Sequence, residues 1–134
     1  MDNNGKKLLI VEDDQFLREF YQELLQGEGY IVDVAGDGEI AFQKITNNKY
    51  DLILLDIMLP KKDGLQILTE LKAGQKMGGL KIVALTNLGQ DSVIKECFDL
   101  GVAGYMIKSA LNPDQVLSEI KTYLSGSSTR SANG

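Results

Sequence analysis

Acidic residues, a hydroxyl and a lysine stand directly after short apolar runs of this 134-residue chain. Glu12-Asp13-Asp14 follow one such run, Asp56 follows a second, and Thr86 and Lys108 follow two others. Carboxylates suit a hard cation, and a cation, a lysine and a hydroxyl are the usual contacts of a bound phosphoryl group. If the fold brings these side chains together, they predict metal-assisted phosphoryl chemistry.

Two signals alternate along the chain: short apolar runs, which predict strands, and apolar residues at helical spacing. The alternation predicts an α/β fold, a doubly wound five-stranded parallel sheet of order 2-1-3-4-5 with helices on both faces. The predicted strands are Leu8 to Val11, Tyr30 to Ala35, Leu52 to Leu55, Ile82 to Leu85 and Val102 to Ile107. The helical stripes are Leu17-Phe20-Leu24, Ala41-Ile45, Leu65-Leu68-Leu71, Val93-Cys97-Leu100 and Val116-Ile120-Tyr123.

Local signals mark an edge strand and several helix ends. Asp33 interrupts the second apolar run, which favours an edge position for that strand. Asp14 and Asp37 are typical N-cap residues, as is Asn112 before a first-turn proline. Gly101 is placed to end the fourth helix.

Charge and hydropathy exclude two classes of partner. The net charge is −5 and the pI is near 4.7, and no segment forms a basic stripe, so we expect no direct nucleic-acid binding. The longest apolar runs, such as Leu8 to Val11, are four residues long, whereas a membrane-spanning helix needs roughly 20. The polar start, Met1 to Lys7, lacks the apolar core of a signal peptide, which predicts a cytoplasmic location.

Length and composition predict one domain over residues 7–124. We expect a disordered start over residues 1–6 and a flexible tail or linker over residues 125–134, where no aromatic or large aliphatic residue occurs. The single Cys97 can form no intrachain disulfide, and its helical spacing predicts a small buried hydrophobe. The absence of histidine excludes histidine-based metal sites and histidine-assisted nucleophiles in this chain.

The predicted strand order brings three acids together. Ligands bind beyond the carboxyl ends of parallel strands, near the point where strand order reverses, so Glu12, Asp13 and Asp56 should lie within several ångströms. Like charges about 4 Å apart cost roughly 4 kcal/mol at an effective dielectric of 20, so this cluster calls for a cation. Oxygen ligands, with a backbone carbonyl at Met58, favour Mg²⁺ or Mn²⁺.

A carboxylate beside Mg²⁺ can attack a phosphoryl group and become an acyl phosphate. Asp56, at the end of an apolar strand, is the candidate, with Lys108 as a second positive point and Thr86 as a hydroxyl donor. Each residue also has a structural interpretation. Glu12 and Asp13 could form a solvated turn, Lys108 could be a surface charge, and the spacing of Tyr105 alone favours a core position.

These residues occur in the order found in one family: over residues 7–124 the chain resembles the receiver domain of two-component response regulators. The resemblance rests on five features in sequence. They are the acidic pair in Val11-Glu12-Asp13-Asp14, Asp56 in the run Asp56 to Gly64, Thr86 after the fourth strand, and Tyr105 and Lys108 around the fifth.

The resemblance implies a role for each residue. Asp56 is the phosphoacceptor. Asp13, Asp56 and the Met58 carbonyl bind Mg²⁺ (or Mn²⁺), which Glu12 reaches directly or through water. Lys108 contacts the phosphoryl group, whereas Thr86 and Tyr105 form a switch pair.

The resemblance also implies partners. A histidine kinase or phosphotransfer protein supplies the phosphoryl group, and a downstream protein or output domain binds the face of the fourth helix, fifth strand and fifth helix. The chain is then a monomer or a phosphorylation-dependent homodimer. It is a signalling protein rather than an enzyme, with intrinsic autophosphorylation and slow autodephosphorylation.

Two residues depart from the family pattern. Ser109 stands where the family usually has a proline in a cis peptide, and a cis bond before a non-proline residue costs about 2.5 to 4 kcal/mol, so we expect a trans Lys108–Ser109 bond. Asn87 stands where a smaller residue is more common, which bears on access to the site and on the dephosphorylation rate.

Three alternatives stay open beside a stand-alone switch. The chain could be the receiver portion of a longer regulator. An aspartyl-phosphate phosphatase would need a second acid at Met58. A nucleotide- or flavin-binding module would not present the acidic Glu12 to Gln15 turn.

Overall fold

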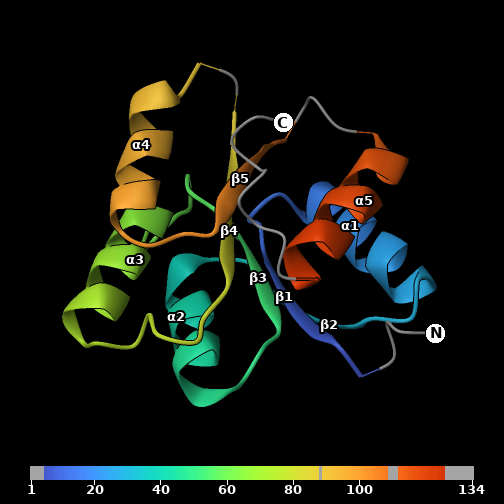
Figure 1. Cartoon of the computed structure of the whole chain (residues 1–134), viewed down its shortest axis with the longest axis horizontal. Helices are drawn as coiled ribbons and strands as arrows, with labels where there is room; N and C mark the ends of the chain where they lie inside the picture. Colours follow the sequence, from blue (N-terminus) through green and yellow to red (C-terminus); the bar gives the residue numbers. More distant parts are fainter. Residues whose placement is uncertain (1–4, 88, 109–111, 126–134) are drawn as a thin grey trace.

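Five parallel strands form one sheet in the order β2-β1-β3-β4-β5 (Figure 1). The computed structural model describes residues 5–87, 89–108 and 112–125. The strands are β1 (Lys7–Val11), β2 (Ile31–Ala35), β3 (Leu52–Asp56), β4 (Ile82–Thr86) and β5 (Gly104–Ile107). The predicted α/β class, strand number and strand order are all confirmed.

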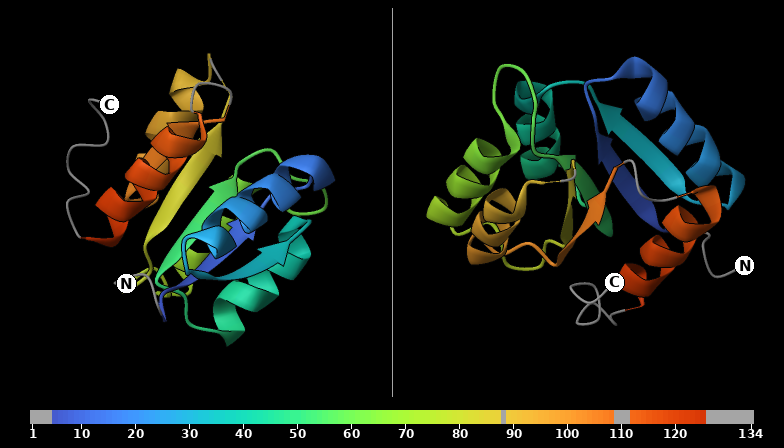
Figure 2. Two further views of the ribbon diagram at one scale, coloured as in Figure 1. Left: turned by 90° about the vertical axis from the view of Figure 1, so that its right-hand side faces the viewer. Right: turned by 90° about the horizontal axis from the view of Figure 1, so that it is seen from above.

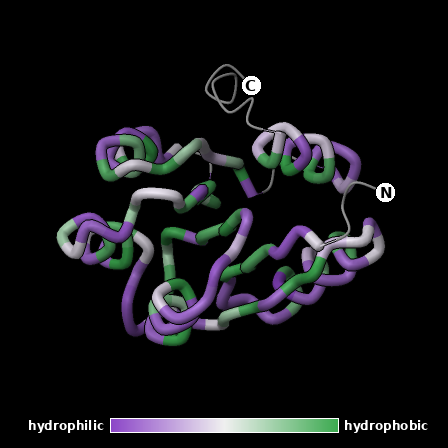
Figure 3. The backbone as a smooth tube through the Cα atoms, turned by 60° about the horizontal axis from the view of Figure 1, so that its bottom comes forward, coloured by the Kyte–Doolittle hydropathy of each residue, from purple (hydrophilic) through white to green (hydrophobic). Residues whose placement is uncertain are grey.

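Helices cover both faces of the sheet (Figure 2). One face packs against α1 (Gln15–Gly27) and α5 (Pro113–Leu124), and the other against α2 (Gly38–Asn47), α3 (Gly64–Ala73) and α4 (Asp91–Asp99). The central strands are almost continuously hydrophobic, as Figure 3 shows, because both of their faces are buried. Among the described residues, no helix combines the length and the apolar character needed to cross a membrane.

The predicted helix ends are confirmed. The side chains of Asp14, Asp37 and Asn112 each accept a hydrogen bond from the third residue of the helix that follows. Asn112 also forms a capping box with Gln115. Gly101 follows α4 with φ at 107°, a left-handed conformation that glycine adopts without steric cost.

Two strands begin later than their apolar runs suggest. Tyr30 was predicted to start β2, but its amide donates to the Leu25 carbonyl and so completes the end of α1. Val102 was predicted to start β5, but its amide donates to the Cys97 carbonyl at the end of α4. In both places the backbone N–H donates to a carbonyl at the end of the preceding helix and is therefore not available to the strand.

The edge position of β2 is confirmed, and Asp33 is part of a polar network there. Asp33 accepts hydrogen bonds from Lys44 Nζ at 2.8 Å and from the Tyr50 hydroxyl at 2.7 Å. Burial by itself would raise the pKa of Asp33, but these two donors outweigh it and hold the pKa below its ordinary value. A charged, paired side chain of this kind protects an edge strand from pairing with other chains.

Cys97 is fully buried on α4, as predicted. Burial raises the pKa of its thiol to about 11. The thiol therefore stays protonated at neutral pH and acts as a small packing residue.

A close contact between α5 and β5 positions the strand that carries Tyr105 and that Lys108 follows. The Tyr123 ring lies so near Gly104 that a Cβ at position 104 would be 2.6 Å from two ring carbons. The Tyr123 hydroxyl also lies 3.5 Å from the Tyr105 carbonyl. Only glycine permits this approach of helix to strand.

We predict that Gly104→Ala lowers the free energy of unfolding by about 1 to 3 kcal/mol, because the added methyl group overpacks the contact with Tyr123. Urea denaturation measures this change. Gly78→Ala is the matched control, since a Cβ at Gly78 meets no atom within 4 Å. Equal stability of the two variants would contradict the prediction.

Candidate functional site

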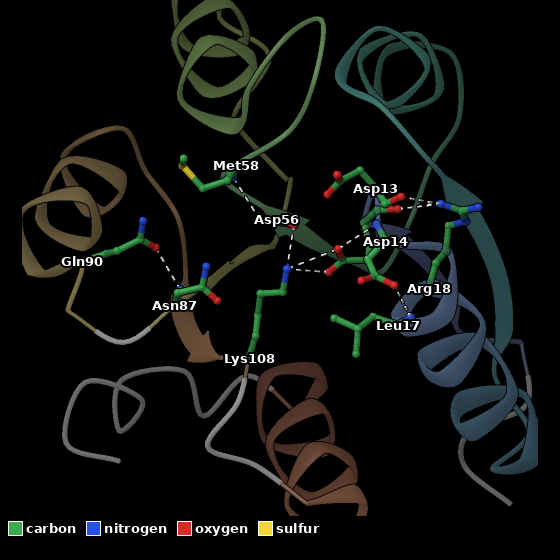
Figure 4. Close-up of polar contacts among 10 residues, drawn as sticks. Asp13, Asp14, Leu17, Arg18, Asp56, Met58, Asn87, Gln90 and Lys108 are labelled. Atoms are coloured by element: carbon green, nitrogen blue, oxygen red, sulfur yellow. Dashed lines mark hydrogen bonds and ion pairs between the residues drawn. The ribbon is translucent and has the colours of Figure 1, made fainter.

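Three acids, Glu12, Asp13 and Asp56, meet at the carboxyl ends of β1 and β3, and Figure 4 labels the two aspartates. Val11 pairs with Leu55 in the parallel ladder, so Glu12 and Asp56 leave neighbouring strands at the same level. One carboxylate oxygen from each of Glu12, Asp13 and Asp56 lies within 4.8 Å of the other two. The cluster predicted from the strand order is therefore present, with Glu12 and Asp56 buried and Asp13 exposed.

Backbone contacts hold the acidic residues in place. The amide of Glu12 donates to the Ala35 carbonyl at 3.1 Å, and its side chain accepts from the Asp14 amide at 3.1 Å. Asp56 Oδ1 accepts from the Met58 amide at 3.0 Å. These carboxylates are oriented by the main chain, which keeps them together despite their mutual repulsion.

Lys108 inserts its ammonium group between the two buried carboxylates. Its Nζ lies 2.9 Å from Asp56 Oδ2 and 3.0 Å from Glu12 Oε1, and only 14% of the side chain is exposed. Three ionised acids and one ammonium carry a net charge of −2. This charge matches a divalent cation.

Burial and the neighbouring charges shift two ionisation equilibria. Burial raises the pKa of Glu12 and the Asp56 charge adds to this, whereas Lys108 opposes it. Burial by itself would lower the pKa of Lys108, but the hydrogen bonds to Asp56 and Glu12 outweigh it and raise that pKa. Lys108 therefore remains an ammonium at neutral pH.

Two buried oxygens at this rim lack a hydrogen bond within the described part of the chain. Thr86 is 1% exposed, and its Oγ1 has no hydrogen-bond partner there. Glu12 Oε1 lies close to Lys108 Nζ but is not aligned for a hydrogen bond. An unsatisfied buried polar group costs about 1 to 3 kcal/mol, so the Thr86 hydroxyl fits a site that takes a ligand, whereas Glu12 Oε1 already forms an ion pair with Lys108.

The donor set fits Mg²⁺. All side-chain candidates are carboxylate oxygens, which hard divalent cations prefer. Asp13 faces solvent, so an ion can reach it while retaining several of its waters. The carbonyl of Met58, as a further ligand, stays a prediction.

The remaining predicted residues surround the rim. Met58 is 58% exposed, and Asn87 stands across from the acids, with its backbone N–H donating to Gln90 Oε1 at 2.9 Å (Figure 4). Tyr105 lies half-buried on β5. The Lys108–Ser109 bond, predicted to be trans, includes Ser109, which lies outside the described residues.

Two contributors to the site were missed by the sequence analysis. Arg18 Nη1 donates to the carbonyl of Glu12 at 2.9 Å and lies 3.4 Å from that of Asp13. Gly64 allows α3 to approach the loop after Asp56, since a Cβ there would lie 2.7 Å from Ile57 Cα. No local sequence pattern indicates the role of Arg18. The role of Gly64 could have been predicted from its place in the motif that begins at Asp56.

We predict that Mg²⁺ raises the melting temperature of the chain, because an ion that binds only the folded state stabilises it by mass action. Asp13→Asn should reduce this rise by removing one anionic ligand, and differential scanning fluorimetry measures it. The rise should be larger at pH 7.5 than at pH 5, since a raised pKa keeps Glu12 partly protonated in acid and protons compete with the metal.

Glu23→Gln is the charge-matched control for Asp13→Asn, since Glu23 is an exposed acid further along α1. An equal response to Mg²⁺ in wild type and Asp13→Asn would argue against the metal site. An equal reduction of the Mg²⁺-dependent rise in melting temperature in Asp13→Asn and Glu23→Gln would also argue against it.

Comparison with known proteins supports this assignment. The family described as Response regulator receiver domain matches residues 8–121. The chain is 38% identical over 129 residues to the transcriptional regulatory protein DltR of Streptococcus agalactiae, covering 95% of this chain and 55% of DltR. It is 31% identical over 109 residues to the chemotaxis protein CheY of Halobacterium salinarum, covering 81% of this chain and 89% of CheY.

Solved structures agree with the sequence matches. A CheY-like receiver domain protein from Methanospirillum hungatei superposes with a TM-score of 0.81 at 30% identity, covering 90% of this chain and 94% of that one. The receiver domain of the sensor histidine kinase PA1611 from Pseudomonas aeruginosa, solved with magnesium coordinated in its active-site cleft, gives a TM-score of 0.79 at 25% identity, covering 90% and 98%.

The chain spans only about half the length of the DltR regulator that it matches, but most of the length of the CheY of Halobacterium salinarum. The fold, the acidic cluster and the family match all lead to the same assignment, and the match extends from β1 to α5. The chain therefore belongs to the response regulator receiver domain family of two-component signalling proteins.

Proposed function

We propose that this chain is a signalling switch that accepts a phosphoryl group on Asp56 from a partner histidine kinase or phosphotransfer protein. The observation that carries the proposal is the placement of Asp56. It is 2% exposed at the end of β3, with Lys108 Nζ at 2.9 Å and Glu12 and Asp13 beside it. Receiver domains pair with histidine kinases, and this chain has no histidine of its own.

In the proposed step, a carboxylate oxygen of Asp56 attacks the phosphorus of a phosphohistidine. The new oxygen–phosphorus bond forms as the phosphorus–nitrogen bond of the donor breaks, and the electron pair returns to the imidazole. Lys108 keeps its positive charge and can follow a phosphoryl oxygen with its flexible side chain. Glu12, Asp13, Asp56 and the Met58 carbonyl would hold Mg²⁺, which, when bound, neutralises the developing negative charge.

The switch is proposed to run through Thr86 and Tyr105. The buried Thr86 hydroxyl, without a partner among the described residues, can donate to a phosphoryl oxygen on Asp56. Movement of Thr86 toward that oxygen leaves space for the Tyr105 ring. The face formed by α4, β5 and α5 then changes its affinity for a downstream protein or output domain, or for a second copy of the chain.

Two contexts for this switch stay in the proposal. In the first, the chain acts alone, as suggested by its similarity to a CheY of nearly the same length. In the second, it is the receiver portion of a longer regulator, as suggested by the DltR relative, of which it spans 55%. The domain limits, residues 7–124, belong to this proposal, and most of the two predicted ends, residues 1–4 and 126–134, lies outside the described residues.

The activity proposed is limited to the chain's own phosphorylation and slow dephosphorylation. A phosphatase acting through an aspartyl phosphate would place a general acid two residues after Asp56, and Met58, which stands there, has no acidic group. Release of the phosphoryl group from Asp56 would therefore rely on water, past the exposed Met58 and Asn87.

We predict that acetyl phosphate with Mg²⁺ adds one phosphoryl group to the wild-type chain and that Asp56→Asn abolishes the addition. Intact-mass spectrometry measures it. Asp51→Asn is the matched control, because Asp51 precedes β3 and so lies at the opposite end of the same strand. Phosphorylation of Asp56→Asn at the wild-type level would overturn the assignment.

We also predict that Thr86→Val leaves phosphorylation of Asp56 intact but weakens its effect on Tyr105. Valine keeps the shape of threonine and removes the hydroxyl that would bind the phosphoryl oxygen. NMR of the Tyr105 ring, before and after addition of beryllofluoride as a phosphoryl mimic, measures the coupling. Thr86→Ser, which keeps the hydroxyl, should behave like wild type, and full Tyr105 shifts in Thr86→Val would count against the switch pair.

A further inference from the structure

The Tyr105 ring has one directional partner within the described residues. It lies half-buried against the apolar cluster beneath α2, α3 and α4. Its ring meets Phe98 edge-to-face, with the centroids 6.2 Å apart and the planes at 88°. In the part of the chain that the structure describes, the Tyr105 hydroxyl makes no hydrogen bond. The ring contact with Phe98 therefore does most to orient this side chain.

Phe98 pairs with Tyr105 and is not one of the buried residues of the hydrophobic core. Its neighbour Cys97 is fully buried on α4, whereas Phe98 is 37% exposed. A phenyl ring that keeps over a third of its surface in water contributes less by burial than a core residue. Its specific interaction is the pairing with Tyr105, which is favourable beyond the area buried.

Phe98 contacts Tyr105 from α4, whereas Thr86 lies further along the sheet toward its carboxyl edge. In the ladder, Tyr105 pairs with Ala84, and Thr86 stands two residues further along β4 on the same sheet face. Helix α4 starts soon after Thr86 and runs back beside β5 (Figure 1). Phe98, seven residues after Asp91, is thus about 10 Å along the helix from its Thr86 end. Movement of the ring toward Thr86 is therefore movement toward the start of α4 and away from the level of Phe98.

We propose that Phe98 is a positioning residue that holds the Tyr105 ring away from Thr86 and thereby sets how readily the switch turns. The inference rests on the proposed function, in which Tyr105 moves toward Thr86 upon phosphorylation. The same movement separates the Tyr105 ring from the Phe98 ring. The Phe98 ring then lies unpaired on the α4 side of the face formed by α4, β5 and α5. An aromatic pair of this kind changes a two-state equilibrium by about 2- to 10-fold.

The test measures the χ1 rotamer populations of Tyr105 by NMR with ring-labelled tyrosine. Phe98→Leu keeps an apolar side chain without a ring, and should raise the population of the minor Tyr105 rotamer by about 2- to 10-fold. It should also lower, by a similar factor, the beryllofluoride concentration needed for half-conversion in Mg²⁺. Phe98→Tyr retains the ring and should restore wild-type values in both measurements.

The matched control is Phe20→Leu. Phe20 is 38% exposed on α1, and its ring meets the Tyr21 ring edge-on, with the ring centroids 5.6 Å apart. The variant therefore loses a similar aromatic pair in another part of the chain. Phe20→Leu should leave Tyr105 unchanged. If Phe98→Leu gives the same Tyr105 rotamers and the same midpoint as Phe20→Leu, the proposal is overturned.

The rotamer measurement needs no phosphoryl chemistry, which separates this inference from the function on which it rests. A wild-type chain that ignores beryllofluoride would count against the proposed function. A shift of the Tyr105 rotamers in Phe98→Leu would still support the role of Phe98 in positioning the ring.

Discussion

The ion pairs of Lys108 with Glu12 and Asp56 are the interaction on which the site depends. Two buried carboxylates about 4 Å apart would repel by roughly 4 kcal/mol at an effective dielectric of 20. The Lys108 ammonium, 2.9 Å from one and 3.0 Å from the other, offsets this repulsion. One positive charge does not balance three acids, so the cluster of Glu12, Asp13 and Asp56 could hold a metal ion.

The parallel sheet makes this arrangement possible. Because β1, β3, β4 and β5 all end at one edge, residues 12, 56, 86 and 108 meet there from distant parts of the chain. Close helix packing then fixes the positions of two of these strand ends along the sheet. Gly64 lets α3 approach the loop after Asp56, and Gly104 lets Tyr123 of α5 approach β5. The precision of the site thus depends on helix packing at these two glycines.

The apolar face that carries Tyr105 connects the site to the surface. Thr86 and Tyr105 share one side of the sheet, and the Tyr105 ring continues to Phe98 on α4. At one end is a buried hydroxyl with no hydrogen-bond partner among the described residues, and at the other a partly exposed aromatic pair. The partly exposed pair can shift at smaller energetic cost than the fully buried strands β3 and β4.

The strand order, the helix caps, the edge position of β2 and the cluster of Glu12, Asp13 and Asp56 could all be predicted from the amino-acid sequence. These follow from local apolar patterns and from the rule that parallel strands place their carboxyl ends on one edge. Only the tertiary structure decided the contacts of Arg18, the pairing of Phe98 with Tyr105 and the late starts of β2 and β5. The physical reason is that these features depend on how helices dock and on which backbone donors they capture, and neither has a local pattern in the sequence.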